Sequence, residues 1–160
     1  MDIKEYDIAN GEGIRVSLWV AGCEHHCPGC HNPETWDACN GNEFMIDHLI
    51  YLEHLLSEKE IAGITFTGGD PLSANNREEI TSMSNYIKRN YPNKTQWLWT
   101  GYSWEDIKHL PIMNNIDVLI DGKYDKDKRD ITLMWRGSSN QRVIDVKKSL
   151  ITNSIVLYCD

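Results

Sequence analysis

Several features that would assign this chain to a broad class are missing from it. No run of about 18 apolar residues occurs, which argues against a transmembrane helix. The first residues are too polar for a secretory signal, so we expect a cytoplasmic protein. Positive charge is scarce, with 16 Lys and Arg against 24 Asp and Glu, and the net charge of −8 disfavours broad binding to nucleic acid or to anionic membranes.

The chain also lacks internal repeats, low-complexity tracts and Pro/Ser-rich linkers. Its 160 residues, 41% of them hydrophobic, are enough to bury one core. We therefore expect a single domain that spans residues 1–160.

A cysteine cluster stands out, and it lacks one ligand. Three of the five cysteines, Cys23, Cys27 and Cys30, fall within eight residues in a C-x3-C-x2-C pattern. Reduced cytosolic thiols at such spacing predict a site for a soft metal. A closed zinc site or an ordinary iron–sulfur carrier needs four ligands, so either a fourth lies elsewhere or one position stays open for a substrate. Candidates for a fourth ligand are His25, His26, His31 and Cys39.

Strand patterns alternate with helical ones along the chain. Strands are predicted at residues 14–20, 63–67, 96–100 and 116–120, with closing or edge strands at 142–146 and 154–158. Helices are predicted at 45–56, at 80–91 after an N-terminal cap formed by Asn76 and Glu79, and briefly after Ser103. Alternating βαβ units imply a mostly parallel sheet. Since the chain is shorter than a full (β/α)8 barrel requires, we expect an α/β fold of the partial, open (β/α) barrel type.

Four individually weak features follow predicted strands directly: the cysteine loop and residues 68–70, 100–102 and 121–123. In a parallel α/β sheet or barrel, these positions gather at one edge, where ligands bind. The order of the elements therefore favours a metal with a bound organic ligand over a structural zinc site.

These residues together resemble the radical S-adenosylmethionine (SAM) enzymes. The resemblance rests on the three-cysteine pattern after one strand and on residues 68–71, Gly-Gly-Asp-Pro, after the next. Residues 10–15 and 30–36 are similar to the glycyl-radical-activating branch. The segments 97–102, 117–124 and 135–142 are similar to the members that act on anaerobic ribonucleoside-triphosphate reductase, so the resemblance covers most of the chain.

The resemblance implies an oxidoreductase with a [4Fe-4S] cluster held by Cys23, Cys27 and Cys30, whose fourth iron chelates SAM. In such enzymes the reduced cluster cleaves SAM and the resulting radical removes a hydrogen atom from a glycine of the reductase large subunit. No catalytic residue is expected beyond the cluster and its SAM. The implied partners are that large subunit, a low-potential electron donor such as a flavodoxin, and a second copy of the chain in a homodimer.

The resemblance also implies cofactor contacts. The segment 68–70 matches the one that contacts the methionine amino group, and an Asp-x-Lys pattern matches residues that hold ribose hydroxyls or the methionine carboxylate. The expected cofactor-binding residues are Gly68, Gly69, Asp70, Thr100, Asp121, Lys123, His31 and Asn32, with Arg15 as a further candidate near the cluster. One departure concerns Gly29, since the wider superfamily often places an aromatic residue there to pack on adenine.

Other functions stay open at this point. A zinc or iron–sulfur module without catalysis would need a fourth fixed ligand. A different radical SAM enzyme would act on a small molecule or on another glycyl-radical enzyme. Cys39 and Cys159 match no cluster position and are interpreted as ordinary thiols, and the tryptophans as packing residues.

Overall fold

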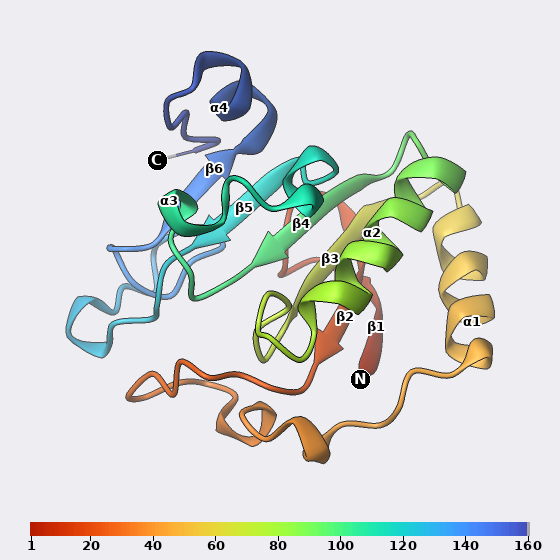
Figure 1. Ribbon diagram of the computed structural model, residues 1–160, viewed down its shortest axis with the longest axis horizontal. Helices are drawn as coiled ribbons and strands as arrows, with labels where there is room; N and C mark the ends of the chain where they lie inside the picture. Colours follow the sequence, from red (N-terminus) through yellow and green to blue (C-terminus); the bar gives the residue numbers. More distant parts are fainter. Residues whose placement is uncertain (160) are drawn as a thin grey trace.

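The computed structural model describes residues 1–159 and contains one six-stranded sheet. The strands lie side by side in chain order, β1 to β6, so the sheet does not close on itself (Figure 1). β2, β3, β4 and β5 are parallel, whereas β1 and β6 are antiparallel to their neighbours. The strands are β1 Asp2–Asp7, β2 Ile14–Val20, β3 Ile61–Gly68, β4 Thr95–Trp99, β5 Val118–Asp121 and β6 Arg142–Asp145.

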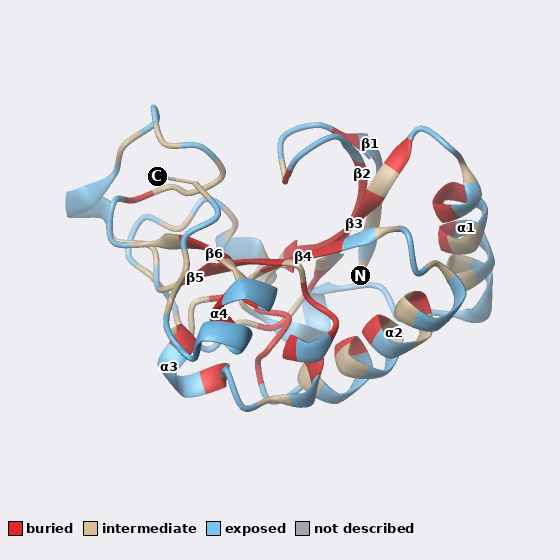
Figure 2. Ribbon diagram, turned by 90° about the horizontal axis from the view of Figure 1, so that it is seen from above, coloured by how far each residue is buried: buried red, intermediate tan, exposed pale blue. Residues whose placement is uncertain are grey.

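The α-helices lie mainly on one side of the sheet. In Figure 2, α1 and α2 are buried where they face the sheet and exposed on the other side. Short 3-10 helices interrupt the loops, including two that follow the cysteines, η1 Pro33–Thr35 and η2 Ala38–Asn40. The helices are α1 Ile46–Ser57, α2 Arg77–Asn90, α3 Trp104–Ile107 and α4 Val146–Thr152, and the remaining 3-10 helices are η3 Pro111–Asn114 and η4 Lys126–Lys128.

The two faces of the sheet differ because side chains alternate along each strand. One face carries Val16, Leu18 and Phe66 into the main core beneath the helices. The other face presents Trp97, which packs with Val118, Ile120 and Val143 in a second core.

Arg15 is fully buried on this second face. Its guanidinium group donates to Thr65 Oγ1 at 2.8 Å, to the Ile64 carbonyl at 2.7 Å and to both Thr95 oxygens at 2.9 and 3.0 Å. It also donates to the Glu12 carbonyl and lies 5.2 Å from the Trp97 ring. Burial lowers the pKa of Arg15 to about 10, so the group stays charged at neutral pH.

The α/β class and the open sheet agree with the prediction, but several local expectations do not. β1 was not predicted. Residues 154–158 do not form a strand, because only Leu157 makes an isolated bridge, to Ile144. Asn76 makes no side-chain cap for α2. Within residues 1–159, no helix is both long and apolar enough to span a membrane.

Candidate functional site

One cavity at the carboxyl edge of the parallel strands brings most of the predicted site residues together. Its volume is about 210 Å³, and the loops after β2, β3, β4 and β5 all contribute to its wall. The predicted residues that line it are Cys23, Cys27, Cys30, His31, Asn32, Gly68, Gly69, Asp70 and Thr100. This is the edge at which parallel α/β sheets bind ligands.

Backbone hydrogen bonds close the segment that carries the cysteines and tie it to the residues after β3. The Cys23 amide donates to the Trp36 carbonyl at 3.0 Å, and the Asp70 amide donates to the Gly22 carbonyl at 2.8 Å. Gly69 has to be glycine here, since a Cβ atom would lie 2.6 Å from the Gly22 carbonyl oxygen. Gly69 therefore lets the cysteine loop approach the end of β3, a reason that the sequence alone did not suggest.

The three thiols of this cavity have the chemistry of soft metal ligands. Burial raises the pKa of Cys23 and of Cys27, while the backbone amides of His25 and Tyr124 respectively act in the opposite direction. The Asn32 amide donates to Cys30 Sγ at 3.4 Å. Amide donors near each sulfur stabilise thiolates, as in iron–sulfur sites. Among residues 1–159, no three His, Cys, Asp or Glu side chains already converge as metal ligands.

The candidates for a fourth protein ligand are mostly engaged or remote. His25 Nε2 lies 2.6 Å from Asp70 Oδ2, and the His25 side chain is only 6% exposed. His26 is exposed and contacts the Glu24 carbonyl, and Cys39 is exposed on η2, outside the cavity. Only His31 lines the cavity without such a bond. The residues thus fit a three-thiolate cluster with one open position, and His31 is the remaining candidate that could close the site.

Asp70 is the junction between three loops. Its carboxylate is 1% exposed and accepts from His25, from Thr100 Oγ1 at 2.9 Å, from the Gly101 amide at 2.9 Å and from the Leu72 amide at 2.8 Å. These donors belong to the loops after β2, β3 and β4. Because protein donors already surround this carboxylate, its main effect is to fix the loops relative to one another.

Comparison with known proteins identifies the family. The 4Fe-4S single cluster domain family matches residues 9–144. The anaerobic ribonucleoside-triphosphate reductase-activating protein of Enterobacteria phage T4 is 50% identical over 137 residues, which are 86% of this chain and 87% of that protein. Proteins of the same name from Pasteurella multocida and Escherichia coli K12 are 42% and 41% identical, over 84% and 86% of this chain and 89% and 92% of theirs. The chain belongs to this family of reductase-activating proteins.

Two expected cofactor residues of this family member, Asp121 and Lys123, do not line the cavity, although Gly122 between them does. The Asp121 carboxylate is buried and accepts from the Trp104 amide at 2.7 Å and from Arg142 Nε at 3.0 Å. Arg142 also pairs with Glu105, and this bond lowers the pKa of Glu105 to about 2. Asp121 therefore holds the end of β5 in place, while Lys123 is exposed beside the cavity.

Arg15, the further candidate, lies on the sheet and does not line this cavity. Sequence reasoning named no site role for Tyr124, Gly137 and Gln141, which also line it, and interpreted Trp99 as a packing residue. Tyr124 is the most informative, because its ring lies near the place of the missing aromatic residue: a Cβ atom on Gly29 would be 3.7 Å from Tyr124 Cε1. The family resemblance already included the segments 117–124 and 135–142, which contain Tyr124, Gly137 and Gln141, but it assigned these residues no task.

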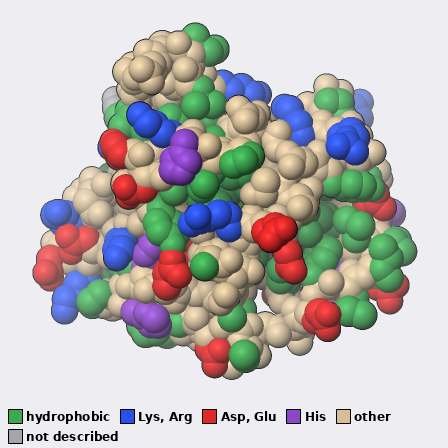
Figure 3. All heavy atoms as spheres, in the orientation of Figure 1, with side chains coloured by type: hydrophobic (Ala, Val, Ile, Leu, Met, Phe, Trp, Pro, Cys, Tyr) green, Lys and Arg blue, Asp and Glu red, His purple; other side chains and the backbone are tan. Residues whose placement is uncertain are grey.

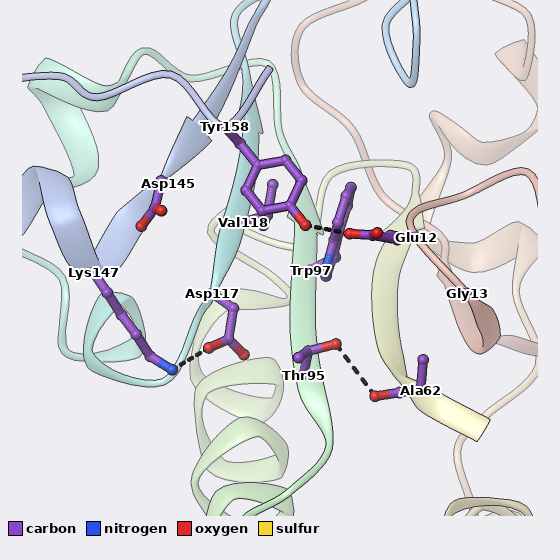
Figure 4. Close-up of a pocket in the computed structure, with 10 residues that line it drawn as sticks. All are labelled: Glu12, Gly13, Ala62, Thr95, Trp97, Asp117, Val118, Asp145, Lys147 and Tyr158. Atoms are coloured by element: carbon purple, nitrogen blue, oxygen red, sulfur yellow. Dashed lines mark hydrogen bonds and ion pairs between the residues drawn. The ribbon is translucent and has the colours of Figure 1, made fainter. Parts of the chain in front are cut away.

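A second cavity, of about 360 Å³, lies at the opposite edge of the sheet (Figure 4). Its charged groups pair with one another: Lys147 with Asp117, and the Tyr158 hydroxyl with Glu12. It contains no cysteine, and its polar groups already have partners, so we assign it no part in the chemistry.

Proposed function

We propose that this protein activates the large subunit of anaerobic ribonucleoside-triphosphate reductase by generating a glycyl radical on it. The proposal makes the chain a radical SAM enzyme, with a [4Fe-4S] cluster held by Cys23, Cys27 and Cys30 and SAM at the open position. When bound, these cofactors would supply one-electron cleavage chemistry, with the electron provided by a low-potential donor such as a flavodoxin. In this proposal the open, mixed sheet is a partial (β/α) barrel in a cytoplasmic single-domain protein.

The observation that carries the proposal is the composition of the cysteine cavity. Three thiols, a glycine-rich strand end and the Asp70 junction face one space, and most candidates for a fourth protein ligand are engaged or lie elsewhere. Such a site leaves a metal position for a small chelating molecule. The 35–50% identity to reductase-activating proteins supports the identity of the partner.

Each group of side chains has a distinct task in this proposal. The backbone at Gly68 and Gly69 receives the methionine amino group, and Asp70 with Thr100 fixes that backbone in place. Lys123, exposed next to Gly122, pairs with the methionine carboxylate. His31 and Asn32 border the cofactor from the cysteine loop. Asp121 acts indirectly, because its carboxylate already binds Arg142.

Adenine then needs a surface that Gly29 does not offer. Tyr124 lines the cavity near Gly29, and its ring centroid lies 5.7 Å from that of His31. We assign adenine packing to Tyr124, whose ring offers the apolar face that such contacts use. Tyr124→Leu should then raise the KM for SAM more than it lowers kcat.

The decisive experiment is anaerobic iron–sulfur reconstitution followed by reduction in the presence of SAM, with and without the reductase large subunit. The proposal requires 5′-deoxyadenosine in both reactions and a glycyl electron-paramagnetic-resonance signal when the subunit is present. If no 5′-deoxyadenosine forms, a zinc or electron-transfer module becomes the better interpretation. If it forms without a glycyl signal, the enzyme acts on a small molecule or on another glycyl-radical enzyme.

A further inference from the structure

The connection between β5 and β6 leaves the cysteine cavity and returns to it. Both of its ends line that cavity, Gly122 and Tyr124 after β5 and Gly137 and Gln141 before β6. Between these ends the chain projects away from the sheet in Figure 1, and residues 126–129 are exposed. In Figure 3 the same side of the molecule carries Lys, Arg, Asp and Glu side chains close together. Water surrounds such a charged tip, so the place of the two ends depends on contacts at its base.

The side-chain amide of Gln141 joins the two ends. Its Nε2 donates to the Gly122 carbonyl at 3.0 Å, and its Oε1 accepts from the amides of Gly137 and Ser138 at 3.0 and 3.2 Å. Turning the amide over would set oxygen against oxygen and N–H against N–H, so these contacts fix its orientation. Gln141 directly precedes β6, where the backbone ladder with β5 ends. Its side chain therefore continues the pairing of the two strands beyond the ladder.

Two more side chains of the returning segment hold the backbone around Tyr124. Asn140 Nδ2 donates to the Lys123 carbonyl at 2.8 Å, and Ser138 Oγ accepts from the Asp125 amide at 3.1 Å. Ser138 is buried, whereas Asn140 is exposed and water competes for its bond. The backbone on both sides of this tyrosine is thus bound to residues that precede β6.

The Tyr124 ring contacts the segment that Gln141 holds. A Cβ atom on Gly137 would lie 3.2 Å from Tyr124 Cδ2, so the ring occupies the space that a side chain at position 137 would need. The ring also lies near Gly29 and has its centroid 5.7 Å from that of His31. Because the ring lies against bare backbone, its position depends on where that backbone stands, and the Gly137 amide is one of the groups bound by Gln141 Oε1.

From these contacts we infer that Gln141 is a positioning residue for SAM and acts through the place that it gives to Tyr124. This inference rests on the proposed function, in which Tyr124 packs on adenine. Although Gln141 lines the cavity, its oxygen already accepts from two amides and its nitrogen donates to a carbonyl. The role needs a donor and an acceptor on one side chain, so Met, which has neither an N–H nor an oxygen, cannot fill it.

Two substitutions of the same kind form the test. Gln141→Met removes the bridging amide at the cavity. Gln96→Met removes a bridging amide of the main core, whose Oε1 accepts from Ser84 Oγ at 2.7 Å and whose Nε2 donates to the Ser84 carbonyl at 3.1 Å. Gln96 does not line the cysteine cavity. Anaerobic equilibrium dialysis of the reconstituted proteins should show SAM binding weakened by roughly fivefold in Gln141→Met and unchanged in Gln96→Met. Wild-type SAM affinity in Gln141→Met would overturn the inference.

A double-mutant cycle tests the route through Tyr124. Tyr124→Leu and Gln141→Met should each weaken SAM binding, and the double variant should bind SAM scarcely more weakly than Tyr124→Leu alone. Full additivity would overturn the inference, because Gln141 would then act on SAM by another route. Amide hydrogen exchange of residues 122–125, measured without cofactors, should be faster in Gln141→Met than in wild type. Unchanged exchange would also overturn the inference, since the backbone would not depend on Gln141.

Turnover distinguishes this inference from the proposed function. At saturating SAM, Gln141→Met should form 5′-deoxyadenosine within about twofold of the wild-type rate, with the loss appearing in the KM for SAM. If SAM is cleaved and both kinetic constants are those of wild type, the inference about Gln141 fails and the proposed function stands. If wild type binds SAM but forms no 5′-deoxyadenosine, the proposed function fails, and the binding cycle still decides whether Gln141 positions the bound SAM.

Discussion

His25 and Asp70, 45 positions apart in the chain, lie 2.6 Å from each other between Nε2 and Oδ2. The His25 ring also packs edge-on against Tyr102, with 4.6 Å between ring centroids. One histidine of the cysteine loop therefore touches the loops after β3 and β4 at once. We interpret His25 as the residue that sets the distance between the cysteines and the glycine-rich strand end.

Replacing His25 should disturb the arrangement of the loops after β2, β3 and β4 without removing a metal ligand. We expect His25→Ala to lower the free energy of unfolding by about 1–3 kcal/mol, since the buried Asp70 loses one of its donors. SAM affinity should fall, whereas the three cysteines should still take up iron. Thermal unfolding, iron content and SAM binding are the measurements. His26→Ala is the matched control, because the exposed His26 side chain contacts the Glu24 carbonyl and the Trp36 ring and lies away from Asp70. Equal effects of both variants would contradict this role.

Gly101→Ala should lower stability and SAM affinity in the same way as His25→Ala, because Gly101 packs against the His25 ring. A Cβ atom at position 101 would lie 2.3 Å from His25 Cδ2, so the histidine has to move. SAM affinity should fall about as far as in His25→Ala. In the double variant the clash is gone. Its loss of unfolding free energy should therefore be much smaller than the sum of the losses in the two single variants. Full additivity in this double-mutant cycle would show that Gly101 acts independently of His25.

Cysteine variants test the assignment of the cluster. Cys23→Ala, Cys27→Ala and Cys30→Ala should each lose most iron and labile sulfide after reconstitution and should form no 5′-deoxyadenosine. Cys39→Ala should keep its iron and sulfide and should still form 5′-deoxyadenosine, because Cys39 is exposed on η2 and does not line the cavity. Iron and sulfide analysis with chromatography of the nucleoside products provides the measurement. An equal loss in Cys39→Ala would make Cys39 a ligand.

Arg142 should matter more for stability than its partial exposure suggests. Arg142→Met leaves the Asp121 carboxylate, which is 1% exposed, without its cation, and breaking such a pair typically costs about 3–5 kcal/mol. Glu105→Gln removes only the exposed partner of the same arginine and should cost about 0.2–1 kcal/mol. Urea unfolding of both variants distinguishes the two contacts. Similar small losses would mean that the Asp121 pair adds little.

Acid should remove the Glu105 contribution in a defined pH range. The bond with Arg142 lowers the pKa of Glu105 from 4.5 to about 2 in the folded protein. Because its pKa is lower in the folded protein, ionised Glu105 stabilises the fold above pH 4.5. This contribution is lost as the pH falls toward 2 and the carboxylate becomes protonated. The difference in unfolding free energy between wild type and Glu105→Gln should therefore shrink across this range. A difference that stays constant from pH 5 to pH 2 would contradict the assignment.

The sequence predicted the parts of the fold that have strong periodicity. The strand at 14–20 matches β2, and the two longer helices match α1 and α2 within a few residues. β1 was missed because it is a mostly exposed edge strand whose order depends on pairing with β2. Residues 154–158 have strand-like composition, but only single backbone bonds, such as Tyr158 N to the Val143 carbonyl at 2.8 Å, hold them beside β6.

The site was predictable to the level of loops but not of every side chain. Strand order brought the cysteines, the glycines after β3 and Thr100 to one edge, as the parallel topology requires. It could not show that Asp121 turns toward Arg142, because that contact depends on β6 running antiparallel beside β5. It also could not show that His25 binds Asp70, since no local pattern links residues so far apart.

The buried Arg15 also helps to hold the segment that follows β1. Its Nε donates to Thr65 Oγ1, and that hydroxyl donates at 2.7 Å to the carbonyl of Asn10, which lines a cavity of about 280 Å³ next to the cysteine cavity. Asp7 also accepts from the amide of Ala9 at 2.8 Å. The segment after β1 is thus tied to the sheet by side-chain hydrogen bonds. A ligand that contacts this segment would meet a surface that is already ordered, so binding would cost less conformational entropy.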